Sequence, residues 1–288
     1  MNIISSFAEV IKTGIIQIIT IFISGVLDNF NTSLTEVLTD ISKTPNNWNS
    51  SIYSMVNSIT NNVIMPIAGM ILAFIMTYDF IEMIINKNNM NEVGTADIFK
   101  WIVKTYIGVM LVTNSLNIVI GIFEVGEYVV NNTLSIINTS VTLDENYLGD
   151  FLITLEDLTI PELLIYLLQS IVLRCGTFII TCLIVIVIYV RMIEIYLRVS
   201  LAPITLATTM GGNSVSPIGQ NYIKSIFAFS FQAFLITLCI GIYAVLIRNV
   251  SVTDNPISYL WECLLYMCVL VFTLTQTGNI SKSIFSSN

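Results

Sequence analysis

The sequence contains no histidine, and only 10% of its 288 residues are charged. Without histidine, the chain lacks a common metal ligand and general base, which argues against zinc or haem sites and histidine-dependent catalytic triads. No Walker motif and no GxSxG motif is present. The cysteines lie in apolar stretches without CxxC spacing, where cysteine behaves as a small apolar residue; they are Cys175, Cys182, Cys239, Cys263 and Cys268. We therefore expect no metal, no cofactor and no enzymatic activity.

Positive charge is scarce, because 11 Lys and Arg residues face 19 Asp and Glu residues. A net charge of −8 without any basic cluster argues against a nucleic-acid-binding surface. Apolar residues make up 55% of the chain and the mean hydropathy is +0.83. A soluble fold of this composition would have too little polar surface to cover its core, whereas a bilayer removes that conflict. The composition predicts an all-α polytopic membrane protein.

Five apolar runs are long enough to cross a hydrocarbon core about 30 Å thick, which takes about 20 helical residues. They are residues 63–78 with an extension at 81–85, 105–123, 175–190, 227–247 and 257–275. The stretch 3–27 is also long enough, but Glu9, Lys12 and Gln17 interrupt it. We expect this stretch to lie in the membrane interface or to insert partly. The count is therefore five spans, or six if 3–27 crosses.

The distribution of Lys and Arg predicts the orientation of these spans, since both residues stay on the cytoplasmic side. One alternating arrangement places seven of them there, together with the C-terminus: Lys87, Lys100, Lys104, Arg191, Arg198, Lys224 and Lys282. Residues 124–162 contain acidic residues and no basic residue, and this segment then lies outside the cell. The region before the first span lies outside if 3–27 does not cross, and begins in the cytoplasm if it does.

The predicted organisation has five parts. Residues 1–57 form an amphipathic or inserted helix and an outer linker, and residues 58–123 form the first two transmembrane helices. Residues 124–162 are the acidic extracytoplasmic segment. Residues 163–220 form the third transmembrane helix, which continues into a cytoplasmic helix–elbow, and residues 221–288 form the last two spans and a cytoplasmic tail.

Three charged residues stand out near the ends of the apolar runs. Asp79 and Glu82 lie three residues apart on one helix face and could form a cation or proton site; the plainer interpretation is an interfacial pair at a helix end. Lys100 and Lys104 could pair with them. Arg174 lies near the outer end of its span, either as an anchor that reaches the interface or as a partner of the acidic segment.

The segment 189–210 reads YVRMIEIYLRVSLAPITLATTM. Arg191, Glu194 and Arg198 fall at i, i+3 and i+7 on one helical stripe, and Glu194 precedes Arg198 by the four residues that favour an ion pair. Pro203 should kink or end the helix, and Gly211 follows in a flexible turn. Such a charged stripe on an apolar helix predicts docking to a partner or a neighbouring subunit. The alternative is a juxtamembrane helix that lies on the lipid interface.

This layout resembles the TrbL-type polytopic subunit of conjugative type IV secretion systems, in the form found on mobile elements of Gram-positive bacteria. The resemblance rests on the acidic outer segment and on RMIEIYLRVSLAPITLA at 191–207, followed by a glycine elbow and two more spans. It implies an inner-membrane subunit of the transfer channel that hydrolyses nothing. It also implies a homo-oligomer that works with other channel proteins and ATPases and helps DNA, as a protein-linked single strand, to cross the membrane.

Two other classes of function stay open at this point. A stand-alone small-molecule transporter or ion channel would use Asp79, Glu82 and Arg174 along its pathway. The absence of an internal repeat argues against it. A membrane enzyme would have to act through carboxylates alone, and these lie mostly in the outer segment or at helix ends.

Overall fold

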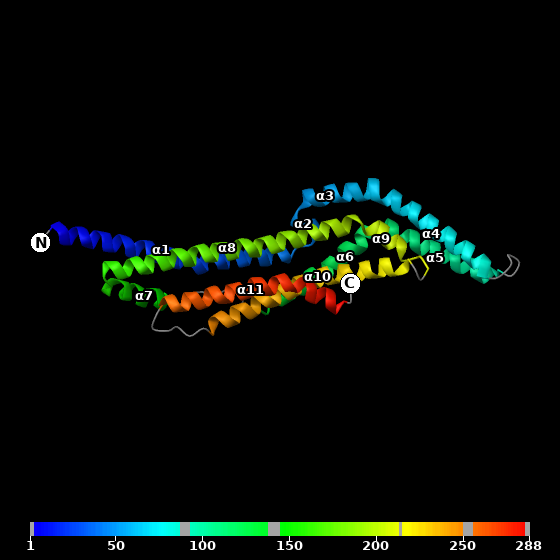
Figure 1. The fold of residues 1–288 in the computed structure, drawn as a ribbon. Helices are drawn as coiled ribbons and strands as arrows, with labels where there is room; N and C mark the ends of the chain where they lie inside the picture. Colours follow the sequence, from blue (N-terminus) through cyan, green and yellow to red (C-terminus); the bar gives the residue numbers. More distant parts are fainter. Residues whose placement is uncertain (1–2, 87–92, 138–144, 213–214, 250–255, 286–288) are drawn as a thin grey trace. The chain divides into compact units, whose positions relative to one another are not determined.

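The computed structural model describes residues 3–86, 93–137, 145–212, 215–249 and 256–285, and within these ranges the chain is helical without any strand (Figure 1). The elements are α1 (Ile3–Ile41), α2 (Pro45–Trp48), α3 (Ser50–Ile59), the π-helical turn η1 (Thr60–Ile64), α4 (Met65–Asn86), α5 (Thr95–Thr113), α6 (Ser115–Leu134), α7 (Glu145–Asp157), α8 (Ile160–Ser200), α9 (Ala202–Thr208), α10 (Ser216–Arg248) and α11 (Pro256–Ile284).

Five helical segments are long and apolar enough to cross a membrane, or six if a bent pair counts as one span. The five are Phe7–Ile41, Ser50–Ile85, Ile160–Ser200, Ser216–Arg248 and Ile257–Ile284. The protein is therefore an all-α polytopic membrane protein, as predicted. The set of candidate spans differs from the sequence prediction in two places. The stretch at the start of α1 is included, and the predicted run 105–123 is not a single helix.

That run breaks at Asn114, where α5 and α6 meet at an angle of 66°. The backbone of Asn114 leaves the helical region, with φ −102° and ψ 13°. Its side-chain Nδ2 donates to the carbonyl of Met110 at 3.0 Å. Asparagine has a low helix propensity and its side chain can bond the preceding turn, so this position favours a break in the helix.

Helix α8 begins at Ile160 and ends at Ser200, just before Pro203, where the sequence predicted a kink or an end. The backbone N–H and the hydroxyl of Thr159 both donate to the carboxylate of Glu162, at 2.8 and 2.7 Å, and Pro161 occupies the first turn. The helix continues without interruption from the third predicted span to Ser200. Pro203 then starts α9 after a break at Leu201.

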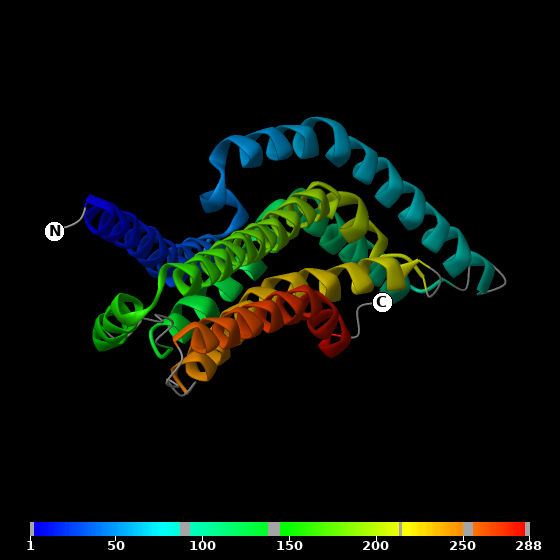
Figure 2. The same ribbon diagram turned by 60° about the vertical axis from the view of Figure 1, so that its left-hand side comes forward.

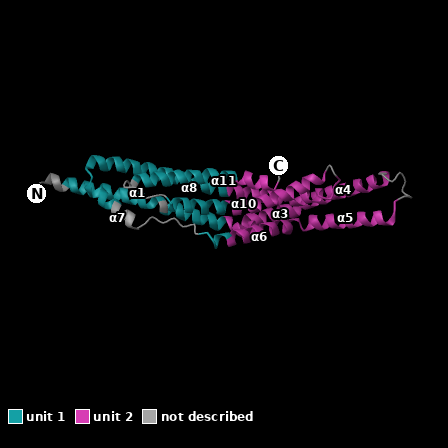
Figure 3. Ribbon diagram, turned by 90° about the horizontal axis from the view of Figure 1, so that it is seen from below, with its two compact units in different colours: residues 1–40, 133–188, 236–276 teal, residues 41–132, 189–235, 277–288 magenta. Residues whose placement is uncertain are grey.

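The chain divides into two compact units, which are described separately (Figure 3). In unit 1 (residues 1–40, 133–188 and 236–276), α1 and α8 run in the same direction. Lys12 Nζ donates to the carbonyl of Glu156, just before α8, at 2.6 Å, and Arg174 of α8 donates to the carbonyl of Gly25. Because both contacts advance along the two helices together, α1 and α8 start on the same side of unit 1.

In unit 2 (residues 41–132, 189–235 and 277–288), α3 leads into α4 along one curve (Figure 2). Helix α5 returns beside α4, and α9 packs against both around Leu72, Ile75 and Ala207. The start of this hairpin lies beside the end of α8, because Tyr196 Oη donates to the carbonyl of Pro45 at 2.7 Å.

Candidate functional site

The exposed surface of α1 changes character along its length. Its first half exposes the apolar side chains of Phe7, Val10, Ile11, Ile18 and Ile21 together with the polar side chains of Glu9, Thr13 and Gln17. From residue 28 to residue 40 the exposed side chains are all polar: Asp28, Asn29, Thr32, Thr35, Glu36 and Thr39. The opposite face of this second half is buried and apolar, with Phe30, Leu34, Val37 and Leu38. We call the exposed set the polar face of α1.

At the matching level of unit 1, α8 exposes apolar side chains. The contact between Gly25 and Arg174 sets the register. Because the two helices are parallel and both rise about 1.5 Å per residue, Thr35 lies level with residue 184. The exposed residues of α8 around that level are Phe178, Ile179, Leu183 and Ile186. Two neighbouring helices thus present opposite kinds of surface at one level.

Arg174 lies in a groove of about 370 Å³ between these two helices. Most of the residues that line the groove carry a hydroxyl or amide group: Asn29, Thr32, Ser33, Thr177 and Thr181, together with Phe178. Among the described residues, the guanidinium bonds the carbonyl of Gly25 and no carboxylate of the acidic segment. A Cβ at position 25 would lie 2.7 Å from Nη1 of Arg174, so glycine permits this approach. Sequence reasoning missed Gly25; its place just before the polar half of α1 was the available signal.

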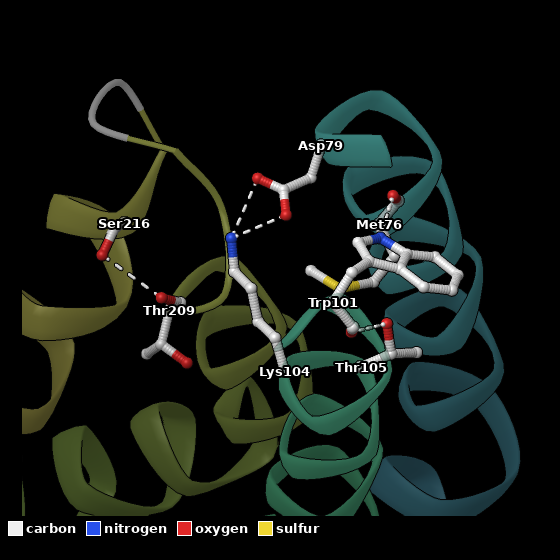
Figure 4. A network of polar contacts seen from close by, with 7 residues as sticks. All are labelled: Met76, Asp79, Trp101, Lys104, Thr105, Thr209 and Ser216. Atoms are coloured by element: carbon white, nitrogen blue, oxygen red, sulfur yellow. Dashed lines mark hydrogen bonds and ion pairs between the residues drawn. The ribbon is translucent and has the colours of Figure 1, made fainter. Parts of the chain in front are cut away.

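Asp79 and Glu82 lie elsewhere, on α4 in unit 2. Lys104 Nζ lies 2.8 Å from Asp79 Oδ2, which confirms one of the predicted pairings (Figure 4). Beside this pair, Trp101 Nε1 donates to the carbonyl of Met76 at 3.0 Å. Glu82 is exposed and borders two hollows of about 410 and 390 Å³ that also share Gly212. Every described contact of Arg174 lies within unit 1, so these contacts do not join the three residues in one pathway.

The predicted docking stripe is mostly turned inwards. Arg191 is 5% exposed, and its Nη2 donates to the carbonyl of Phe229 at 3.0 Å. Arg198 Nη1 bonds Ser225 Oγ at 3.0 Å, so this side chain reaches α10 rather than Glu194. Pro203 is buried at the start of α9, while Glu194 is exposed. A docking role for this segment stays a prediction, and Glu194 is the residue that is free to carry it.

No group of His, Cys, Asp and Glu suited to a metal ion occurs among the residues that the structure describes. The model of the family described as TrbL/VirB6 plasmid conjugal transfer like protein matches residues 30–203, more than half of the chain. The chain belongs to the TrbL/VirB6 family. Neither the comparison with curated proteins nor the comparison with solved structures gave a match.

Membership of the TrbL/VirB6 family makes this protein a multi-pass membrane component of a conjugal transfer system, which works with other parts of that machinery. The family match begins at Phe30, within the polar half of α1, and ends at Pro203. It therefore includes most of the polar face, Arg174, the α4–α5 hairpin and the segment from Arg191 onwards.

In this TrbL/VirB6 family member, the pairing of Asp79 with Lys104 can be tested by charge reversal. Asp79→Lys or Lys104→Asp alone places like charges together and should lower the thermal stability of the purified protein. The double reversal should recover about 1 kcal/mol of coupling, because both side chains are partly exposed. Combining Asp79→Lys with Lys100→Asp is the mismatched control and should give less recovery. Equal recovery in both double variants would mean that the side chain at position 79 responds to the overall charge nearby and not to the residue at position 104 in particular.

Proposed function

We propose that the protein, with further copies of itself, forms part of the conduit through which a conjugal transfer system moves DNA across the cell membrane. The cargo is a single strand linked to a protein. The observation that carries the proposal is the polar face of α1, which lies level with an apolar surface of α8 in the same unit.

The contrast between the two helices calls for two different surroundings at one depth. The exposed surface of α8 there belongs to the uncharged run 175–190, which suits lipid. Polar side chains exposed to lipid are costly, and a charge at the bilayer centre costs about 2.5–3.5 kcal/mol on insertion scales. Asp28 and Glu36 on α1 therefore favour water. Both surroundings are present at one depth if the exposed face of α8 contacts lipid and the polar face of α1 borders a water-filled passage.

The chemistry of this face suits passage rather than retention. Its exposed groups are hydroxyls, amides and two carboxylates, and it carries no exposed Lys or Arg between residues 28 and 40. Affinity for a nucleic acid backbone comes mainly from Lys and Arg contacts with phosphates. A passage without such contacts would let a polyanion move along it without being trapped.

The length of α8 supports assembly with other subunits. Its exposed apolar residues extend from Leu164 to Leu197, which is about 50 Å of helix. A hydrocarbon core is about 30 Å thick, and helix tilts rarely exceed about 40°. Lipid alone therefore does not cover this surface. Neighbouring copies, other channel proteins and the ATPases of the machine are the partners that we propose for the remainder.

We also propose five crossings, made by α1, α6, α8, α10 and α11. Because α1 and α8 start on the same side, the chain between them crosses an odd number of times. The α3–α5 hairpin starts beside Tyr196, near the end of α8, and its tip at Glu82 borders the α9–α10 link. The start and the tip of the hairpin thus lie on one side of the membrane. This leaves α6 as the one crossing between α1 and α8. The positive-inside rule makes this side, with the end of α11, cytoplasmic.

Cysteine accessibility tests the proposed passage. In a variant without the five native cysteines, Thr32→Cys and Thr35→Cys should react with a membrane-impermeant thiol reagent in assembled channels, and the reaction should block DNA transfer. Leu183→Cys and Ile186→Cys, level with them on α8, are the matched controls. We expect about a hundredfold slower reaction there, because the reactive thiolate is a charge that lipid disfavours.

Equal reactivity on both helices would remove the basis for the passage. Normal conjugal transfer in a clean deletion of the gene would contradict the proposed role altogether. Substrate flux through the isolated protein in liposomes, abolished by Asp79→Asn, would instead support a stand-alone transporter or ion channel.

A further inference from the structure

Three cationic side chains from two helices converge on one aromatic residue of a third helix. The guanidinium carbon of Arg198 lies 4.2 Å from the ring centroid of Phe229, and Lys282 Nζ lies 5.2 Å from it. Arg191 bonds the backbone carbonyl of the same residue. All of these residues belong to unit 2, and they come from α8, α10 and α11.

The two arginines have only neutral described partners. These are the carbonyl of Phe229 and the sulfur of Met192 for Arg191, and Ser225 Oγ with the Phe229 ring for Arg198. The Nε atoms of both arginines are buried without a hydrogen-bond partner. Like charges held close together repel, and a buried donor without an acceptor costs free energy. An anion beside Arg198 and Lys282 would relieve the repulsion between the cations.

The spacing of charges along α8 and α11 places the cluster at the surface of the bilayer. On α8, Arg174 and Arg191 bound the uncharged run and lie about 26 Å apart, close to the thickness of a hydrocarbon core. Arg198 lies about 10 Å further along, at the level of lipid headgroups. On α11, Lys282 is the first charged residue after Glu262, about 30 Å of helix away. Both helices therefore place their cations at a membrane–water boundary.

We propose that Arg198 and Lys282, which are partly exposed and lie beside the buried Phe229 ring, bind the phosphate of an anionic phospholipid. The planar guanidinium suits the oxygens of a phosphodiester, and the ammonium adds a second positive charge. Arg191 is too buried to touch the headgroup; it holds the backbone of Phe229 and adds to the positive field. Anionic lipids are concentrated at the cytoplasmic surface, where basic pockets between transmembrane helices bind them. This site does not depend on the proposed conduit.

The test is native mass spectrometry of the full-length protein in detergent, titrated with phosphatidylglycerol and, separately, with phosphatidylcholine. We expect bound phosphatidylglycerol and little phosphatidylcholine. Arg198→Gln and Lys282→Gln should each weaken phosphatidylglycerol binding about tenfold, as expected for the loss of a charge-assisted hydrogen bond. Arg198→Lys keeps the charge and should recover part of the binding.

Lys224→Gln is the matched control. Lys224 is an exposed cation on α10, and its position five residues before Phe229 places it about 140° around the helix from that ring. Binding should be nearly unchanged in this variant, and an equal loss would mean unspecific attraction and overturn the site. Displacement of the lipid by equimolar inorganic phosphate would reassign the site to a soluble anion. Displacement by an equimolar single-stranded oligonucleotide would reassign it to DNA.

Discussion

Replacing Gly126 with leucine is expected to disrupt unit 2 and to reduce DNA transfer to the level of a gene deletion. Gly126 lies on α6 where this helix contacts α10. A Cβ at this position would lie 3.0 Å from the backbone carbonyl oxygen of Ser230, and the Ser230 hydroxyl donates to the carbonyl of Ile122 at 2.8 Å. A backbone atom cannot turn aside as a flexible side chain can, so the added atoms must push the two helices apart. Overpacking of this kind costs about 1–3 kcal/mol, and leucine adds more atoms than most such substitutions.

The sharper comparison uses alanine at two glycines of the same helix. Gly121 also lies on α6, but a Cβ there would meet nothing within 4 Å. Gly121→Ala should therefore raise thermal stability, because alanine in a helix interior is favoured over glycine by up to about 1 kcal/mol. Gly126→Ala gains the same helical preference and should still lower stability. If the two variants unfold at the same temperature in detergent, the close approach of α6 and α10 is wrong.

The proposed topology predicts an all-or-none labelling result. In the variant without native cysteines, Asn46→Cys on α2 should be protected from an impermeant thiol reagent in intact cells and should react in inverted vesicles. Ser283→Cys near the end of α11 should behave in the same way. Asp157→Cys on α7 should react in intact cells. The reason is the parallel course of α1 and α8, which puts the end of α1 on the same side as the end of α8.

Six crossings with antiparallel α1 and α8 would give the opposite pattern at one position. Asn46→Cys would then react in intact cells together with Asp157→Cys. Ser283→Cys is the internal control, since α11 ends in the cytoplasm in both arrangements. Labelling of Asn46→Cys from outside would therefore reject the five-crossing arrangement and leave the fold class untouched.

The sequence was informative where a property depends on neighbours along the chain. The uncharged run 175–190 and Pro203 locate the course and the C-terminal end of α8, because hydrophobic length and proline act locally. The positions of Asp79 and Lys104 near the facing ends of two apolar runs were enough to anticipate this one pairing.

Properties that depend on packing between helices could not be predicted from the sequence. Arg191, Glu194 and Arg198 share a helical stripe, yet α10 covers Arg191 and draws Arg198 towards Ser225, which the spacing alone does not reveal. The parallel course of α1 and α8 depends on contacts more than a hundred residues apart in sequence. The break at Asn114 interrupts an apolar run that hydrophobicity along the chain predicts to be one helix.

The packing of α9 against the α4–α5 hairpin has a consequence for synthesis of the protein. Helix α4 ends at Asn86 and α9 begins at Ala202, so the ribosome adds more than a hundred residues between them. At about 5–20 residues per second, the nascent hairpin waits for roughly ten seconds before its covering helix exists. During that time Leu72 and Ile75 lack their final neighbours on α9. The completion of unit 2 is therefore timed by the emergence of α9 rather than by the insertion of α4 and α5.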